Sequence, residues 1–311
     1  AGEGTKTQQI KSLLQNFHES NLYTDPFPHV IIDNALPENI YTELEKSIPN
    51  DLISQSDIQL NNFRTNIFPD QLKNDLKHKI WYDFLAYHNS IDFYEEFISI
   101  FKHEINKLYP NLINEQKKKF IKKDSIKTMR NKDSAKIQKG ETLFTSIYGC
   151  NTPVKIPTSV IQPHLDHYNK FYFGLYYLRP DEDKSEGGDL EIYKWKDSYS
   201  NFKKKNIIFT EKWTNMYEHV NPVKKVEYKK NSVIFGINTI DSLHGVTVRQ
   251  KTDYIRQLAY FSTALDKDIG FATPNLLEKL FFKNLSFGDK IEIIKKSFNT
   301  WSRRLRSLLK I

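Results

Sequence analysis

Cysteine is nearly absent from this chain of 311 residues, in which Cys150 stands alone. A single cysteine excludes a disulfide framework and a cysteine-based zinc site, and it favours a reducing compartment. No apolar run approaches the roughly 20 residues that a membrane-spanning helix needs. The opening residues, AGEGTKTQQI, lack the basic and then apolar pattern of a secretory signal. We therefore expect a cytoplasmic protein.

Positive charge dominates the chain, but it is concentrated in two stretches that together outweigh the formal net charge of +8. Residues 271–311 hold nine Lys or Arg against three acidic residues, and residues 117–139 hold ten against two. The remainder is net acidic, so the two stretches flank the middle of the chain and do not form one basic face. Solvated surface is the ordinary interpretation, and contact with a polyanion or a membrane surface is the alternative. This distribution argues against nucleic acid as a partner.

The chain changes character at Thr142. Before it, apolar residues recur at helical spacing over 7–22, 71–87 and 92–108, and the lysine-rich stretch 117–139 is typical of a loop. After it come short runs of strand-forming residues broken by Gly, Pro, Asn and Asp, such as FYFGLYYL and SVIFGIN. Short strands that follow helices predict an α+β protein, mainly β, with a sandwich or barrel carried on a helical support.

This change of pattern divides the chain into three parts. We expect an N-terminal helical or mixed support segment over 1–141 that packs on the core. The β core is expected over 142–265, with an insert at 196–222 that is either a lid or a surface hairpin. Residues 266–311 return to helical spacing and are expected to form a basic amphipathic tail.

His164 and Asp166 lie in the segment SVIQPHLDH, which reads as a strand. Residues i and i+2 of a strand point to the same face, so both side chains can reach one metal ion, whereas His167 points to the other face. By itself this pattern is expected about once by chance in a chain with nine histidines and 38 acidic residues. A third ligand from a distant strand is needed, and NSVIFGINTIDSLHGV offers His244.

Two histidines and one carboxylate on one face leave coordination positions open, which suits ferrous iron that must also bind a cosubstrate and dioxygen. Twelve residues after His244, Arg256 lies inside the aromatic strand DYIRQLAYFS. A buried guanidinium must be paired, and its planar fork matches the carboxylate of a ligand.

These segments together resemble the 2-oxoglutarate- and iron(II)-dependent oxygenases, in particular their prolyl-hydroxylase-like branch. The resemblance is carried by five segments in order, over about two-fifths of the chain: PHLDH, KFYFGLYYL, EGGDLEIY, NSVIFGINTIDSLHGV and YIRQLAYFS. It implies a double-stranded β-helix (jelly roll) core flanked by N-terminal and C-terminal helices. It also implies hydroxylation of an unactivated C–H bond, with release of succinate and carbon dioxide. The cofactors would be Fe(II), 2-oxoglutarate and dioxygen, with ascorbate as an optional reductant.

By the same resemblance His164, Asp166 and His244 match the iron ligands. Arg256 and Tyr177 match the pair that holds the distal carboxylate of 2-oxoglutarate. Tyr148 matches a cosubstrate-contacting tyrosine, although the spacer between it and His164 is longer than in the family. Lys170 stands where relatives carry a basic residue near the substrate.

Each of these residues also has a purely structural interpretation. Tyr177 is otherwise a core tyrosine, and Lys170 a solvated lysine. Two other functions stay open: a non-catalytic cupin-like module that holds zinc or no metal, and an oxygenase that acts on nucleic acid, which the basic stretches suggest. The expected substrate is a small molecule, a peptidyl group or a glycan- or lipid-linked group, because one fold serves many substrates.

The tail yields a first testable prediction. Between residues 276 and 311 an apolar stripe alternates with basic side chains, a pattern that either packs on the core, forms a dimer contact or lies on an anionic membrane. We expect packing, so truncation after residue 273 should lower the melting temperature by several degrees or cause aggregation. A membrane-binding tail would instead leave stability unchanged and abolish sedimentation with anionic liposomes. A truncated protein as stable, soluble and monodisperse as the full chain would contradict packing.

Overall fold

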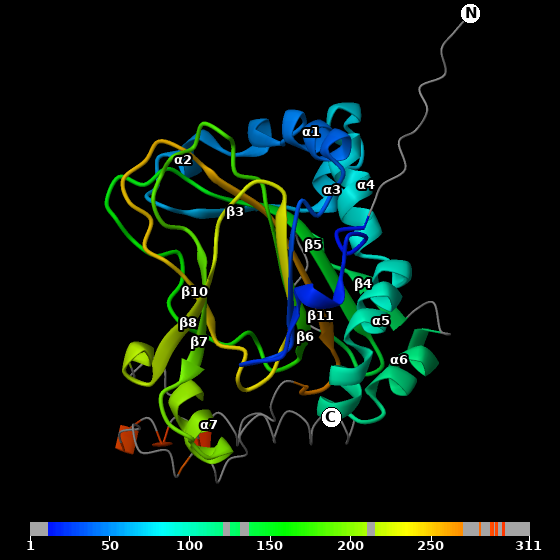
Figure 1. The fold of residues 1–311 in the computed structure, drawn as a ribbon, viewed down its shortest axis with the longest axis vertical. Coiled ribbons are helices and arrows are strands. Elements are labelled where there is room, and N and C mark those ends of the chain that lie inside the picture. Colours follow the sequence, from blue (N-terminus) through cyan, green and yellow to red (C-terminus); the bar gives the residue numbers. More distant parts are fainter. Residues whose placement is uncertain are drawn as a thin grey trace, which may run out of the picture.

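The computed structural model describes residues 12–120, 125–130, 137–209 and 215–269, with a few isolated positions beyond residue 279. Within these ranges the chain forms a mixed eight-stranded sheet, a three-stranded antiparallel sheet and a layer of helices (Figure 1). No helix in the described part of the chain is both long and apolar enough to cross a membrane.

The large sheet has the strand order β1-β2-β9-β6-β11-β5-β3, and β4 lies parallel beside β5. All its other pairings are antiparallel. The strands are β1 (Leu22–Tyr23), β2 (His29–Asp33), β3 (Arg64–Ile67), β4 (Ile126–Thr128), β5 (Thr142–Asn151), β6 (Lys170–Tyr177), β9 (Ser232–Ile237) and β11 (Arg256–Leu265). The central place of β11, between β5 and β6, brings chain segments from both sides of the insert together.

The small sheet has the order β10-β7-β8, formed by β7 (Leu190–Trp195), β8 (Val220–Val226) and β10 (His244–Val246). Three isolated bridges extend it on the β10 side, because residues 154–164 pair antiparallel with residues 244–252. From β5 to β11 the chain thus passes several times between the two sheets, with β7 and β8 as consecutive strands of the small one.

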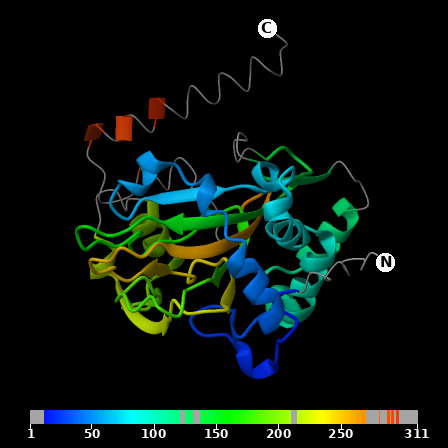
Figure 2. The same cartoon turned by 90° about the horizontal axis from the view of Figure 1, so that it is seen from above.

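The helices are mostly N-terminal: α1 (Glu38–Lys46), α2 (Gln55–Ile58), α3 (Pro69–Leu72), α4 (Lys79–His88), α5 (Ile91–Leu108) and α6 (Leu112–Phe120), with α7 (Asn201–Phe209) inside the insert. Figures 1 and 2 show α4, α5 and α6 along one side of the large sheet. Single-turn 3-10 helices link some of these elements, and α5 begins where Ser90 accepts a hydrogen bond from the Phe93 amide.

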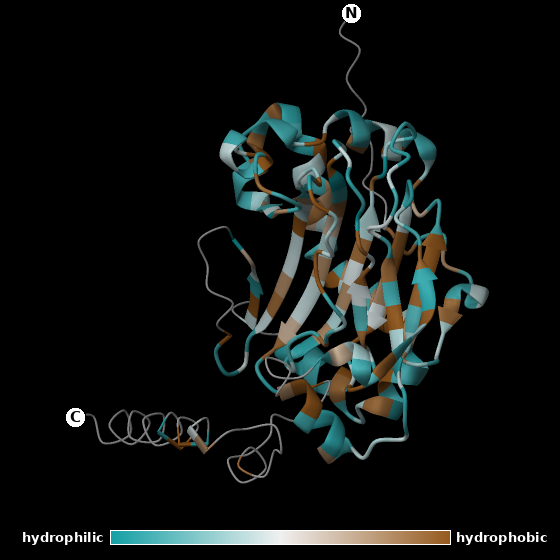
Figure 3. Ribbon diagram, turned by 90° about the vertical axis from the view of Figure 1, so that its left-hand side faces the viewer, coloured by the Kyte–Doolittle hydropathy of each residue, from teal (hydrophilic) through white to brown (hydrophobic). Residues whose placement is uncertain are grey.

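Figure 3 shows hydrophobic and hydrophilic residues interspersed along the strands, and side-chain alternation gives the large sheet two faces. One face packs on α4 and α5 through aromatic contacts, among them Phe84 with Phe261 and Phe97 with Tyr172. The opposite face, which includes Leu258 and Leu175, belongs to smaller clusters on the side of the small sheet. The helices therefore cover the outer face and leave the inner face available for a site.

The prediction of an α+β protein is confirmed, since the strands form a mixed sheet that is accompanied by helices. The helix predicted over 71–87 is instead divided among α3, a 3-10 turn and α4. The lysine-rich stretch was predicted to be a loop, yet α6 runs into it and β4 lies within it. Where the structure describes the predicted helix 7–22, it finds turns and a short 3-10 helix. Most of the tail 266–311 lies outside the described residues, and the division at residue 142 stays a prediction.

Asn231 joins the support to the sheet and yields a stability prediction. Its backbone is left-handed, with φ 52°, and its side chain is 1 % exposed. Its Oδ1 accepts from the Leu36 amide at 3.0 Å and the Tyr176 hydroxyl at 2.9 Å, and its Nδ2 donates to the Leu36 carbonyl at 2.8 Å. Asn231→Ala removes these bonds and strains the backbone, which should cost about 2–4 kcal/mol of unfolding free energy in urea titrations.

Asn231→Gly is the matched control, because glycine adopts positive φ without strain but makes none of the side-chain bonds. It should be destabilised less than Asn231→Ala. An alanine variant as stable as the original protein would show that the hydrogen bonds contribute nothing.

Candidate metal centre and cosubstrate site

A His–Asp–His cluster forms where residues 154–164 meet β10. His164 and His244 are bridge partners, with backbone N–O distances of 2.9 and 3.1 Å. Asp166 follows two residues later, and one ligand atom from each of the three residues lies within 4.8 Å of the others. The structure therefore brings together three side chains that are separated by up to 80 residues, and their donor set suits a divalent transition metal.

Both histidines are oriented by neighbouring carbonyl groups. Nδ1 of His164 lies 2.9 Å from the Gln162 carbonyl oxygen, and Nδ1 of His244 lies 2.9 Å from that of Ser242. Because a carbonyl only accepts, this network assigns the proton to Nδ1 and leaves the Nε2 lone pair for a metal. Burial, reinforced by nearby His164, lowers the pKa of His244 to about 4, so this ring is neutral at physiological pH.

Asp166 is held by Lys170, four residues along the chain. The Lys170 ammonium donates to Asp166 Oδ1 at 2.8 Å and to the Tyr260 hydroxyl at 2.7 Å. Burial favours protonation of Asp166, but Lys170 and then His244 lower its pKa below the usual value. The carboxylate is thus ionised, with Oδ2 left for a metal. Two of the three Lys170 N–H donors are used in this way.

Arg256 lies at the start of β11 and is 2 % exposed. Its Nε donates to the Gly188 carbonyl at 2.7 Å, and Nη1 donates to Asn151 Oδ1 at 3.4 Å. The guanidinium carbon lies 5.2 Å from the ring centres of both Tyr177 and Tyr228. The absence of a side chain at Gly188 leaves room for the Arg256 side chain, since an added Cβ would lie 3.1 Å from the Arg256 Cδ.

Three buried hydrogen-bond donors around this guanidinium have no hydrogen-bond partner within the described chain: Arg256 Nη2, the Tyr177 hydroxyl and Asn151 Nδ2. Burial raises the pKa of Tyr177, against the opposing influence of Arg256, so the hydroxyl keeps its proton. Buried donors left unpaired are costly, and a carboxylate is the acceptor that satisfies several at once. The residues therefore fit the distal carboxylate of 2-oxoglutarate. Sequence reasoning missed Asn151, whose only signal is its cross-strand register with Arg256.

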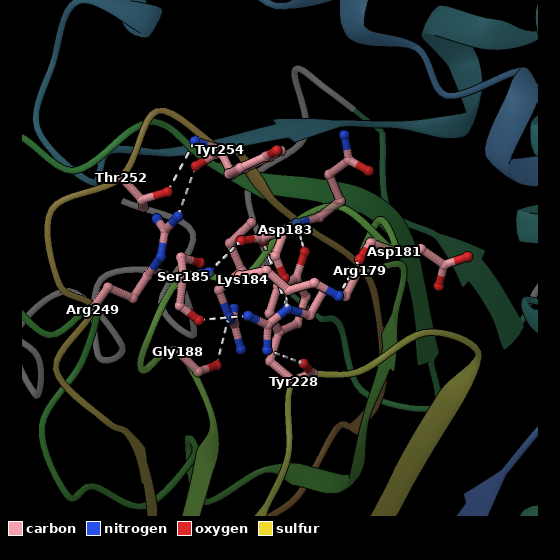
Figure 4. A network of polar contacts seen from close by, with 12 residues as sticks. Arg179, Asp181, Asp183, Lys184, Ser185, Gly188, Tyr228, Arg249, Thr252 and Tyr254 are labelled. Atoms are coloured by element: carbon pink, nitrogen blue, oxygen red, sulfur yellow. Dashed lines mark hydrogen bonds and ion pairs between the residues drawn. The ribbon is translucent and has the colours of Figure 1, made fainter.

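Arg249 is also buried, at 2 % exposure, but both of its Nη groups have hydrogen-bond partners, and Figure 4 shows the contact to Tyr254. Nη1 donates to Asn62 Oδ1 at 2.7 Å and to the Thr152 carbonyl at 3.0 Å, and Nη2 donates to the Tyr254 carbonyl at 2.9 Å. These contacts tie loops together, which distinguishes Arg249 from the partly unpaired Arg256.

The structure places Tyr148 away from this site. Tyr148 is the cross-strand partner of Ala259, three residues from Arg256, so it lies on the outer face. There its ring meets Trp81 edge-on at 5.1 Å, and its hydroxyl donates to Asn50 Oδ1 at 3.3 Å. Tyr148 therefore belongs to the core that faces the helices and not to the expected cosubstrate contact, because side-chain alternation along β5 directs its ring to the outer face.

Comparison by sequence finds no matching protein-family pattern and no matching curated protein. Comparison of structures finds two prolyl hydroxylases and a protein solved with 2-oxoglutarate among its matches. A Trichoplax adhaerens prolyl hydroxylase, solved with a peptide fragment of hypoxia-inducible factor, is 11 % identical with a TM-score of 0.38, covering 76 % of this chain and 83 % of that one. A Pseudomonas putida prolyl-4-hydroxylase is 10 % identical (TM-score 0.36; 76 % and 91 % covered). HygX from Streptomyces hygroscopicus, solved with nickel and 2-oxoglutarate, is 9 % identical (TM-score 0.32; 76 % and 83 % covered).

The metal centre yields a binding prediction. His164→Ala and His244→Ala should each abolish stoichiometric binding of Mn(II) or Fe(II), measured by anaerobic titration calorimetry, because two remaining ligands cannot hold the ion. His167→Ala is the matched control, since its exposed ring contacts Asn169 and lies outside the cluster. Circular dichroism should show all three variants folded. Full metal affinity in both ligand variants would refute the assignment.

Proposed function

We propose that this protein is an Fe(II)- and 2-oxoglutarate-dependent dioxygenase that hydroxylates an unactivated C–H bond. One observation carries the proposal. The Arg256 guanidinium, which has an unpaired donor, lies on the same inner face of the large sheet as Tyr260. Tyr260 is hydrogen-bonded to Lys170, and Lys170 is hydrogen-bonded to Asp166 of the His–Asp–His cluster. A metal-ligand set and a carboxylate receptor in one interior are what a keto-acid cosubstrate requires.

The two sheets support a finer description of the fold. From β5 to β11 the chain passes back and forth between the sheets: the bridged segment 154–164, the consecutive pair β7 and β8, and β10 lie on the side of the small sheet, whereas β6, β9 and β11 lie in the large one. We infer from this a double-stranded β-helix, or jelly roll, with the helices as its support. Residues 1–141 would then be the support, 142–265 the core, and α7 part of the insert.

The residues have distinct tasks in this proposal. His164, Asp166 and His244 would hold the iron through Nε2, a carboxylate oxygen and Nε2. Arg256, Tyr177 and Asn151 would hold the distal carboxylate of 2-oxoglutarate. When bound, iron, 2-oxoglutarate and dioxygen supply the oxidation that releases succinate and carbon dioxide, while the protein orients and shields the reactants. Ascorbate would serve as an optional reductant.

Lys170 acts through Asp166 in this arrangement. Its contacts to Asp166 and Tyr260 fix one carboxylate oxygen and leave the other to face the metal. The third N–H of the Lys170 ammonium remains as a donor for a substrate group. The proposal therefore retains Lys170 as a substrate contact, as expected from the sequence.

Phe173 adds an apolar wall to the metal centre. Its ring stacks on His244 at 4.4 Å with an interplanar angle of 20°. The ring restricts the orientation of this ligand from the side of β6 and excludes water there.

The alternative functions fit less well. A cupin-like module that only holds a metal has no use for buried donors around Arg256. Action on nucleic acid would draw on the basic stretch 117–139, yet Lys119 pairs with Asp266, and Lys127 pairs with Glu141 at 2.7 Å. We propose a cytoplasmic enzyme that acts on a small-molecule, peptidyl or glycan- or lipid-linked substrate.

The direct test is turnover. Purified protein with Fe(II), 2-oxoglutarate and oxygen should release succinate in the absence of substrate, and omission of any one component should stop the release. A mass-spectrometric screen of candidate substrates should find a product heavier by one oxygen atom. Absence of succinate under all conditions, together with normal metal binding, would favour the non-catalytic module.

Arg256 provides the binding test. Loss of a charge-assisted pair in a buried site costs about 2–5 kcal/mol, and lysine does not restore the planar fork. Arg256→Gln and Arg256→Lys should therefore weaken 2-oxoglutarate binding to the Mn(II)-loaded protein at least tenfold and raise its KM. Lys184→Gln, which removes an exposed charge, is the control. Unchanged affinity for 2-oxoglutarate in both Arg256 variants would contradict the assignment of Arg256 to the distal carboxylate.

A further inference from the structure

Arg64 lies on the same inner face as the proposed cosubstrate site. In β3 it is the cross-strand partner of Asn151, which is in turn the partner of Arg256 in β11. Residues directly opposite one another on neighbouring strands project to the same side of a sheet. The side chains of Arg64, Asn151 and Arg256 therefore form a row across three strands.

The Arg64 guanidinium lies on the bare backbone of Gly149 in β5. A Cβ added to Gly149 would lie 2.2 Å from Arg64 Nη2 and 2.5 Å from Cζ, closer than atoms can approach. The Nε group donates to Asn66 Oδ1 at 2.8 Å. The missing side chain at Gly149 is thus what leaves room for the guanidinium against β5.

Arg64 is half-buried, and its electrostatic neighbours include both Arg256 and Tyr260. Burial, and next the charge of Arg256, lower the pKa of Arg64 to about 10, while Tyr260 acts to raise it. Arg64 is therefore within electrostatic range of both Arg256 and Tyr260, and it stays cationic at neutral pH. Tyr260 in turn accepts from Lys170, which holds Asp166.

This part of the interior has an excess of positive charge. Arg64 and Arg249 both lie within electrostatic range of Arg256, and none of the three is in an ion pair within the residues that the structure describes. Asp183, the carboxylate that acts on Arg249, is paired with Arg179. The loop contacts of Arg249 use both of its Nη groups, and the distal carboxylate of 2-oxoglutarate would neutralise Arg256. That leaves the cation of Arg64 without a counter-charge, a costly arrangement in a partly desolvated site unless a ligand supplies one.

We propose that Arg64 binds an anionic group of the substrate, a carboxylate or a phosphate ester, and so selects an acidic substrate. This inference rests on the proposed oxygenase function. It assigns to Arg64 the orientation of the substrate along the inner face toward the metal centre. Arg256 and its neighbours hold the cosubstrate.

The test uses the full chain saturated with Mn(II) and 2-oxoglutarate, so that the cosubstrate site is filled. Sulfate, as a probe for a phosphate ester, and acetate, as a probe for a carboxylate, are titrated separately by calorimetry in chloride buffer. At least one probe should bind at one site per chain, and the stronger one indicates which kind of acid the substrate carries. Arg64→Gln should weaken that binding at least tenfold.

Two variants test the geometry. Gly149→Ala should also weaken the probe at least threefold, because the new methyl group displaces the guanidinium without removing its charge. Arg64→Lys should bind better than Arg64→Gln, since it retains the charge. Lys155→Gln, which removes an exposed cation outside this row, should bind the probe as the original protein does.

Binding of 2-oxoglutarate to the Mn(II)-loaded variants separates this inference from the proposed function. Arg64→Gln should change that affinity less than threefold, whereas Arg256→Gln weakens it at least tenfold. If neither probe binds, or if both probes bind Arg64→Gln as well as the original protein, the inference is wrong while the oxygenase assignment stands. If Arg64→Gln weakens 2-oxoglutarate as much as Arg256→Gln does, Arg64 belongs to the cosubstrate clamp and the inference is overturned.

Discussion

The backbone bridge between His164 and His244 is the interaction on which the site depends. Two antiparallel hydrogen bonds, at 2.9 and 3.1 Å, fix the two segments side by side, and the bridges at Thr158 and Val154 continue the pairing. A metal ion needs ligand atoms placed to within a few tenths of an ångström, which backbone pairing provides better than side-chain packing alone. The Gln162 and Ser242 carbonyls then orient the two rings through contacts local to each segment.

Coverage of the large sheet on one face leaves the other face for chemistry. Aromatic side chains of α4 and α5 bury the outer residues of β5, β6 and β11. This burial stabilises the fold without contributions from the inner face, which can therefore carry unpaired donors and cations at some cost in stability. Proteins often place such unsatisfied groups at functional sites and offset their cost elsewhere in the fold.

The cations on the inner face show how position decides the role of chemically identical groups. Arg249 donates to backbone and amide oxygens and joins loops, whereas Arg256 keeps an Nη group without a partner in the described structure. Arg64 depends on the absence of a side chain at Gly149. Burial makes each unpaired donor costly, so these groups indicate the charge of what the site is built to receive.

The sequence by itself determined some of the elements and the candidate ligands. Apolar periodicity located α5 to within one residue of the predicted 92–108, and the spacing of His164 and Asp166 put both side chains on one side of an extended segment. These features are local, because they follow from the 3.6-residue and two-residue periods of helices and strands. The resemblance to oxygenases added Arg256 and Tyr177, but it also suggested Tyr148.

Only the tertiary structure decided which faces meet. Tyr148 and Asn151 lie three residues apart on β5, yet Tyr148 packs on Trp81 and Asn151 contacts Arg256, because odd spacing on a strand reverses the side-chain direction. Arg64 precedes Arg256 by 192 residues, and strand order and register bring them into one row. Register and strand order depend on long-range pairing that no local pattern encodes, which is why the ligands could be predicted from the sequence and the row of Arg64, Asn151 and Arg256 could not.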